Sequence, residues 1–205
     1  CDIDYDDFGL SLTDLKKRIN KKTSAIIVVH LFGKMSKIKE IKSLIKNRNI
    51  KLIEDCAQAH GTKIDNKYAG TFGDISTFSF YPTKNLGAYG DAGCILTKNK
   101  NLNIKCRRIK NHGSLIKYDH KLIGRNSRLD PFQAIVLNEK IKKLNSDIIK
   151  KNKLSKIYFK RLSRLDRFIK LPEVKKKEVH SSHQFVIICK KRNQLRKYLK
   201  KNKIE

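Results

Sequence analysis

Residues 25–55 read AIIVVHLFGKMSKIKEIKSLIKNRNIKLIED, and this stretch decides the fold class. It opens with a continuous run of small and β-branched apolar residues, Ala25 to Val29, which is typical of a strand buried on both faces of a parallel sheet. Apolar residues then recur at helical spacing from Ile38 to Ile45, and Lys51 to Ile53 predicts a second strand. Strand, helix and strand in about 30 residues predict a right-handed βαβ unit, and hence an α/β fold with a mostly parallel sheet.

Further elements are expected on both sides of this unit. Leu12 to Ile19 predicts a short helix with Ser11 or Thr13 as its N-cap, and Gly61 to Gly73 has the composition of loops. A change of pattern near residue 166 predicts a boundary between a large domain, 1–165, and the start of a smaller α/β domain, 166–205. The remaining expected elements are strands at 75–80, 93–97 and 185–189, and helices at 102–109, from 131 to 165 without interruption, and at 194–201.

The charge of the chain is strongly basic. Its 205 residues include 48 Lys and Arg against 19 Asp and Glu, a formal net charge of +29 that makes binding to nucleic acid or to an anionic membrane a legitimate hypothesis. Only 11 of the 48 are Arg, however, and the 37 Lys are spread along the whole length, whereas readers of phosphates and bases rely on clustered Arg. The abundance of Lys, Asn and Ile together favours the codon bias of an A/T-rich genome over nucleic-acid function.

The cysteines and the apolar segments limit the remaining classes. Five scattered cysteines without a C-x-x-C pair argue against a disulfide framework or a zinc site, and we expect reduced, mostly buried thiols and no metal. No stretch approaches the ~18 consecutive apolar residues of a membrane span, and the first residues do not resemble a signal peptide. We therefore expect a soluble cytoplasmic protein. Because the chain lacks a starting Met and begins within a pattern, we also expect a piece of a longer protein.

Three polar clusters lie where an α/β sheet places ligands, at the carboxyl ends of its strands. The first, residues 54–61 (EDCAQAHG), follows the strand at Lys51–Ile53; from spacing alone, a cap of the next helix explains an acidic residue there slightly better than a ligand site does. The third, residues 124–130 (GRNSRLD), is rich in hydrogen-bond donors and suits either an anion site or a turn held by Asn and Asp side chains.

The second cluster, residues 76–93 (STFSFYPTKNLGAYGDAG), carries a possible nucleophile. One lysine among 37 has no meaning by itself. Lys84 is distinctive because it lies between the end of a strand and a glycine-rich loop, five residues after Ser79. A lysine amine can attack a carbonyl to form a Schiff base if it is able to lose its proton.

Taken in order, VVHLFG, IEDCAQAHG, FSFYPTKNLGAYGDAG, KNHGS and GRNSRLDPFQAIVL resemble the DegT/DnrJ/EryC1/StrS family of sugar aminotransferases, and HSSHQFVI resembles the start of the family's C-terminal segment. The similarity spans essentially all 205 residues. It implies the aspartate-aminotransferase-like fold, known as fold type I, and pyridoxal 5′-phosphate as the cofactor. Lys84 matches the family's Schiff-base lysine. Relatives with a histidine at this position catalyse dehydration, so Lys84 favours transamination.

The resemblance also implies roles for other residues. Asp55 matches the aspartate that pairs with the protonated pyridine nitrogen and keeps the ring an electron sink. Ala57 would lie against one face of the ring, and Gln58 would lie near its 3-hydroxyl group. Ser79 matches a hydroxyl donor to the cofactor phosphate. Asn126 matches an asparagine that reaches the phosphate of the neighbouring subunit's cofactor, which implies a homodimer with shared active sites.

The expected substrates follow from the same resemblance. They are a nucleotide-linked keto-sugar, aminated at the 3-keto position of a 6-deoxy or related sugar, and glutamate as the amino donor, in polysaccharide or O-antigen biosynthesis. The family segments that precede Cys1 and follow Glu205 are absent from this chain. An alternative hypothesis is therefore a truncated or non-catalytic homologue whose basic surface binds anionic polymers.

Overall fold

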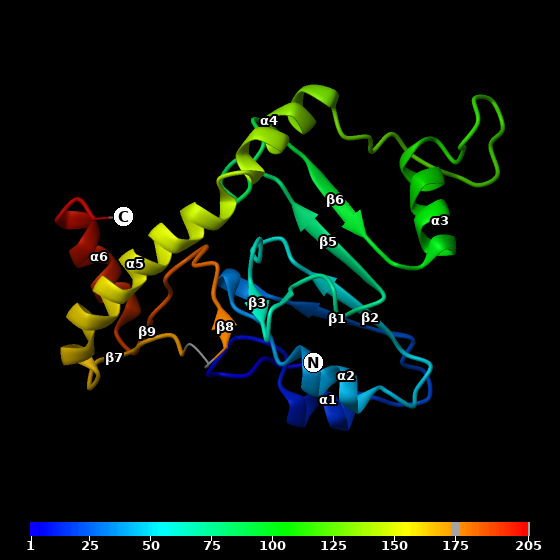
Figure 1. Cartoon of the computed structure of the whole chain (residues 1–205). Helices are drawn as coiled ribbons and strands as arrows, with labels where there is room; N and C mark the ends of the chain where they lie inside the picture. The colour runs from blue at the N-terminus through cyan, green and yellow to red at the C-terminus, as the bar shows by residue number, and fades with distance from the viewer. Residues whose placement is uncertain (174–176, 205) are drawn as a thin grey trace.

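A four-stranded sheet forms the centre of the computed structural model, which describes residues 1–173 and 177–204 (Figure 1). Its strand order is β1-β2-β5-β6; the first three strands are parallel, and β6 runs antiparallel to β5. The predicted α/β class with a mostly parallel sheet is confirmed. The strands are β1 (Ala25–Val29), β2 (Lys51–Asp55), β5 (Ile75–Ser79) and β6 (Gly93–Leu96).

Two short helices, α1 (Leu12–Arg18) and α2 (Ile38–Leu44), cover one face of this sheet, and the predicted cap Ser11 accepts a hydrogen bond from the backbone of α1. The side chains of both helices pack on alternate residues of β1 and β2. On the other face of β1, Ile27 is 59% exposed and Val29 is 39% exposed. The expectation that this strand is buried on both faces is therefore wrong in this structure, because the covered face is the one beneath α1 and α2.

The region from Gly61 to Gly73 contains a hairpin as well as the expected loops. Strands β3 (Lys63–Ile64) and β4 (Lys67–Tyr68) pair antiparallel across two turn residues with positive φ. The other edge of β3 pairs with β8 (Glu178–Val179) from the far end of the chain. A strand of two residues has no periodicity, which is why the sequence pattern did not reveal this sheet.

The expected long helix after Asp130 is two helices, α4 (Pro131–Ile141) and α5 (Leu144–Leu162), and a 3₁₀ turn follows α5. Asp130 caps α4, since its Oδ1 accepts a hydrogen bond of 2.8 Å from the backbone N–H of Phe132. The two helices pack on different partners. Leu137 of α4 belongs to a cluster with Leu86 and Ala88, whereas Ile148 of α5 lies over Gly61.

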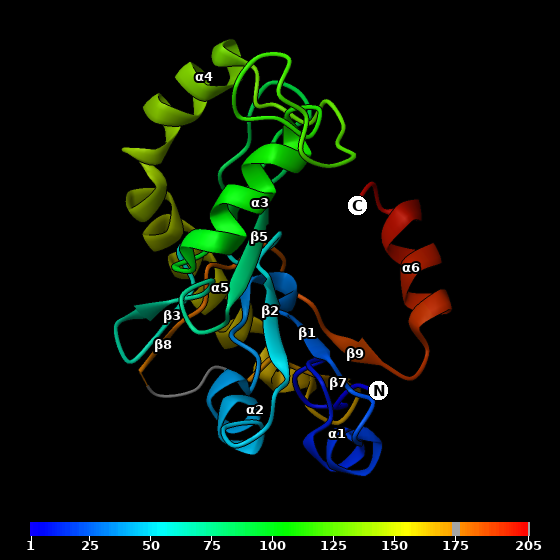
Figure 2. The same cartoon turned by 90° about the vertical axis from the view of Figure 1, so that its right-hand side faces the viewer.

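Beyond α5 the chain returns along the molecule before ending in a separate helix (Figure 2). The expected strand at 185–189 is reduced to β9 (Ile188–Cys189), which pairs with β7 (Ile169–Lys170). Phe185 instead packs against the rings of two α5 residues, with centroids 5.1 Å away in each case. The remaining helices are α3 (Lys100–Lys110) and α6 (Arg192–Lys201), both close to their predicted positions. The domain boundary near residue 166 stays a prediction.

The structure tests two further expectations, one about the thiols and one about membrane-spanning helices. All five cysteines are free, as expected, but only Cys56 is buried, so the expectation of mostly buried thiols is wrong. Within 1–173 and 177–204, every helix is too short or too polar to cross a membrane.

Candidate functional site

Two neighbouring strands end side by side at the predicted site. Asp55 is the last residue of β2 and pairs in register with Thr77 of β5, two residues before Ser79 at the end of β5. Asp55 Oδ1 accepts a hydrogen bond of 3.0 Å from the backbone N–H of Ala57. The residues after Asp55 form turns and start no helix, so the alternative that these acidic residues cap a helix is wrong.

The loop that carries Lys84 is closely held in place. Its two ends pair where the N–H of Phe80 donates to the carbonyl of Ala92 at 2.7 Å. Lys140 of α4 donates to the carbonyl of Gly87 at 2.7 Å, and Leu86 is buried against α4. The contacts with α4 therefore fix the backbone of the loop that carries Lys84.

Lys84 and Ser79 open into the same cleft, which has a volume of about 590 Å³. In the described part of the chain, the Lys84 amine has no hydrogen-bond or ion-pair partner. The cleft thus brings together an amine, hydroxyl groups, a carboxylate and a guanidinium. Its lining residues are Ser79, Tyr81, Lys84, Asp91, Ala92, Gly93, Ser127, Arg128 and Leu129.

The other predicted site residues lie outside this lining. Asp55, Ala57 and Gln58 are half-buried at and just beyond the end of β2. Gln58 Oε1 accepts a hydrogen bond of 2.7 Å from the backbone N–H of Phe32, which fixes the orientation of its amide. Asn126 is exposed, and its Oδ1 accepts from Nε of Arg128 at 3.2 Å. The structure thus joins Ser79 and Lys84 in one cleft and places Asn126 two residues from the cleft residue Arg128.

Among the lining residues that were not selected from the sequence, three carry polar or charged side chains suited to a ligand: Tyr81, Asp91 and Arg128. Tyr81 and Asp91 belong to the loop motif around Lys84, and Arg128 belongs to the polar segment before α4. Both segments were singled out, but sequence alone does not show which of their side chains face one cleft. Proximity in the fold decides that.

Two histidines near Lys84 have altered acidity. The pKa of His60 is lowered to about 4, chiefly by burial; an interaction with the Ser79 backbone opposes this shift, and electrostatic interactions with His183 and Lys84 add to it. The ring of His60 lies between Phe78 and Phe80, with centroids 5.5 and 5.7 Å away. Burial, followed by the charges of Lys84 and Lys151, also lowers the pKa of His183. The surroundings of Lys84 therefore disfavour additional positive charge.

A second polar cluster, formed by His30, Glu54 and Cys56, lies buried under the sheet, with potential ligand atoms within 4.8 Å of one another. Its groups are already used. His30 Nε2 lies 2.9 Å from Glu54 Oε2, and Nδ1 accepts from the backbone of Ser36, so Nε2 carries the donated hydrogen. Three backbone N–H groups at residues 70–73 donate to the Glu54 oxygens. Burial raises the pKa of the Cys56 thiol, which keeps it protonated. We interpret this cluster as structural rather than as a metal site.

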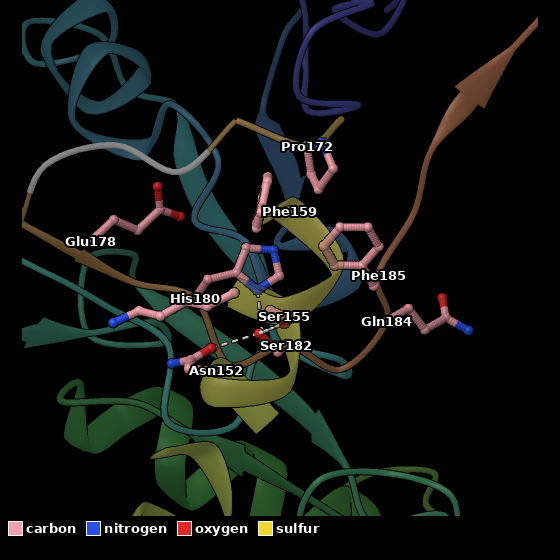
Figure 3. A pocket seen from close by; sticks show the side chains of 10 residues that line it. Asn152, Ser155, Phe159, Pro172, Glu178, His180, Ser182, Gln184 and Phe185 are labelled. Carbon is pink, nitrogen blue, oxygen red and sulfur yellow. Dashed lines mark hydrogen bonds between the residues drawn. The ribbon is translucent and has the colours of Figure 1, made fainter. Parts of the chain in front are cut away.

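A second cleft, of about 600 Å³, lies between α5 on one side and Pro172 with residues 178–185 on the other (Figure 3). Phe159, Pro172 and Phe185 form its apolar part. Its polar side is a chain of hydrogen bonds in which Ser182 Oγ lies 3.1 Å from Ser155 Oγ and 2.6 Å from Asn152 Oδ1. Two residues of α5 therefore hold Ser182 in place by hydrogen bonds.

The model of the DegT/DnrJ/EryC1/StrS aminotransferase family matches residues 1–205. The chain belongs to this family. A relative from Geobacillus stearothermophilus, called a pleiotropic regulatory protein, is 39% identical over 99% of this chain and 55% of its own length. A UDP-N-acetyl-3-dehydro-alpha-D-glucosamine 3-aminotransferase from Acidithiobacillus ferrooxidans is 38% identical over 90% of this chain and 50% of its own. The chain thus spans about half the length of the curated relatives it matches.

Solved structures of family members have the same fold. DesV of S. venezuelae, in complex with a ketimine intermediate, superposes with a TM-score of 0.94 at 33% identity, over 99% of this chain and 54% of DesV. The E. coli GDP-4-keto-6-deoxy-D-mannose-3-dehydratase, with bound hydrated pyridoxal phosphate, gives 0.92 at 26% identity, over 100% of this chain and 58% of the dehydratase. The predicted aminotransferase-like fold is confirmed, and the family includes both transaminases and dehydratases.

Proposed function

We propose that this chain forms the cofactor-binding part of a pyridoxal-phosphate-dependent aminotransferase that acts on a nucleotide-linked keto-sugar, with Lys84 as the lysine that binds the cofactor. The observation that carries the proposal is the cleft of about 590 Å³ that Lys84, Ser79 and Arg128 line together, in which the Lys84 amine has no partner among the described residues. The names of several relatives, which are 3-amino-sugar transaminases, support the substrate class.

The residues of this cleft fit the cofactor's functional groups. Its aldehyde needs an amine, which Lys84 supplies, and its phosphate needs hydroxyl and cationic donors, which Ser79 and Arg128 supply. Asp55 would hold the pyridine nitrogen, and Ala57 would lie against the ring. When bound, the cofactor supplies an electron sink for the carbanion formed at the amino donor's α-carbon.

The chain's own residues would divide the remaining tasks. Nζ of Lys84 would anchor the aldehyde and later carry the proton between the donor's α-carbon and the cofactor's C4′. Gln58 would donate from Nε2 to the 3-hydroxyl, because its Oε1 is engaged by the Phe32 backbone. A lysine at position 84 favours amination over dehydration, and we propose glutamate as the donor and the 3-keto carbon of a 6-deoxy or related sugar as the acceptor.

Asn126 supports a shared site. Its side chain is exposed beside the cleft residue Arg128, outside the lining of the chain's own cleft. We propose that it reaches the cofactor phosphate of a second subunit in a homodimer, and that the enzyme works in the cytoplasm on precursors of a polysaccharide such as O-antigen. Sedimentation of the full-length gene product at several concentrations would test the dimer, because a monomer throughout would contradict it.

The test of the cofactor lysine is the visible spectrum of the full-length gene product with pyridoxal phosphate, before and after borohydride reduction. Wild type should show an absorption band that borohydride removes, and peptide mass analysis should locate the reduced adduct at Lys84. Lys84→Ala should lack the band, whereas Lys98→Ala, a change at an exposed lysine in a bend, should retain it. A folded wild type without a band would contradict the proposal and favour the non-catalytic homologue with a basic surface.

A further inference from the structure

The side chain of Asn85, the residue after Lys84, joins three separate parts of the fold. Its Nδ2 donates a hydrogen bond of 2.8 Å to the backbone carbonyl of Ser181. Its Oδ1 accepts one of 2.5 Å from Nζ of Lys151 on α5. Both ends of one amide are thus used to connect the Lys84 loop with a helix and with a segment almost 100 residues away along the chain.

The anchor at Ser181 is firmly placed. Ser181 is fully buried, and its N–H donates to the carbonyl of Gly33 at 2.9 Å. Gly33 has a φ of +91°, and a Cβ there would lie 2.4 Å from Ser181 Oγ and 3.0 Å from the backbone nitrogen of His183, so this close packing requires glycine. Asn85 is therefore attached to a rigid point next to the turn after β1.

The other contact joins the Lys84 loop to a second lysine, Lys151. Lys151 lies on α5, and its charge and that of Lys84 both act on His183. Asn85 occupies the position between these groups, since it neighbours Lys84 in sequence and contacts both Lys151 and the residue two before His183. The Asn85 amide thus links the Lys84 loop both to Lys151 and to the segment that carries His183.

We propose that Asn85 is a positioning residue for Lys84, acting through its hydrogen bonds to the Ser181 carbonyl and to Lys151. This inference rests on the proposed function of Lys84. Covalent chemistry depends on the placement of the attacking amine, and a displacement of about 1 Å can cost on the order of 10²-fold in rate. Removal of the Asn85 amide should therefore slow the reaction of Lys84 with an aldehyde, with only a small change in the stability of the fold.

The chain offers a matched control on the same helix. Ser155 of α5 contacts Ser182, the residue next to Ser181, through a hydrogen bond of 3.1 Å. Ser155→Ala removes a hydrogen bond between α5 and the segment that contains Ser181. This bond lies at the cleft shown in Figure 3 and does not involve the Lys84 loop. A merely structural role for Asn85 predicts similar effects of Asn85→Ala and Ser155→Ala.

The experiment measures the rate at which pyridoxal phosphate forms a borohydride-trappable adduct at Lys84 in the full-length gene product, together with the melting temperature. Asn85→Ala and Lys151→Met should slow trapping by about tenfold or more, and Ser155→Ala by less than about twofold. Lys151→Arg, which keeps a cationic donor, should restore most of the rate. Equal rates for Asn85→Ala and Ser155→Ala would overturn the inference.

Hydrogen exchange without cofactor separates this inference from the proposed function. Asn85→Ala should increase amide exchange in residues 80–89, whereas Ser155→Ala should leave it unchanged. If wild type forms no adduct at Lys84, the proposed function fails, and the exchange data still decide whether Asn85 positions the loop. Unchanged exchange in Asn85→Ala would overturn the positioning role by itself.

Discussion

The cluster at His30 and Glu54 and the cleft at Lys84 both lie on the same sheet, yet their polar groups differ in burial and in hydrogen bonding. Glu54 and His30 are fully buried, and both nitrogens of the ring and both carboxylate oxygens have partners within the protein. Lys84 is half-buried, faces an open volume, and in the described part of the chain has no such partner.

This difference distinguishes polar groups that stabilise the fold from polar groups that are available for function. A buried polar group costs stability unless it is hydrogen-bonded, so a fully satisfied cluster is explained by folding alone. An amine that the protein leaves free beside hydroxyl and guanidinium groups is available to a ligand. We therefore expect substitutions in the cluster to change stability, and substitutions in the cleft to change chemistry.

The largest expected effect is the loss of activity in Lys84→Ala. Transamination by the full-length gene product should fall on the order of 10³-fold or more, because no other group replaces the amine. The free energy of unfolding should stay within about 0.5 kcal/mol of wild type, since the side chain makes no hydrogen bond to any residue that the structure describes. Steady-state kinetics and urea unfolding would check both parts. A large loss of stability in Lys84→Ala would contradict the view that the cleft serves chemistry while the cluster serves stability.

Glu54→Gln should show the opposite behaviour. The amide would place N–H donors against backbone N–H groups of residues 70–73 that now donate to the carboxylate. Breaking such a buried, charge-assisted arrangement costs about 3–5 kcal/mol. Urea unfolding would measure the loss, with Glu139→Gln on the exposed face of α4 as the control. A stability equal to that of wild type would show that the cluster is not structural.

The pH dependence of the free energy of unfolding gives a second test of the structural role of Glu54. Burial alone would raise the pKa of Glu54, but hydrogen bonds from His30 and from the backbone of Gly73 and Gly70 outweigh burial and hold the pKa below its usual value. A carboxyl group with a lowered pKa in the folded state contributes stability above its unfolded pKa and loses it as the pH falls through the folded pKa. The stability difference between wild type and Glu54→Gln should therefore shrink in acid.

A smaller effect is expected at His60, whose ring packs against Phe78 and Phe80. Burial lowers its pKa to about 4, so between about pH 6.5 and 4 the unfolded chain binds a proton that the folded chain does not. Stability should fall across this window by up to about 3 kcal/mol from His60. Unfolding free energies at several pH values should show a shallower fall in His60→Phe. An identical fall in both proteins would assign the pH effect to other groups.

Local patterns in the sequence were enough for most of the central fold. The run of β-branched residues from Ala25 to Val29 predicted β1, because such residues favour strands. The helical spacing from Ile38 to Ile45 predicted α2, because side chains that pack on one core must recur with the period of their element. The family motifs also placed Ser79 and Lys84 in one site, and the structure puts both in one cleft.

The sequence by itself thus determined the α/β class, the family and the segment that carries Lys84. The tertiary structure decided features that depend on residues far apart in the chain: the break between α4 and α5, the pairing of β3 with β8, and the contact of Asn85 with Ser181. Periodicity reports which face of an element is buried, but not which distant segment buries it. Long-range packing alone settles those partners, and with them the positions of the groups around Lys84.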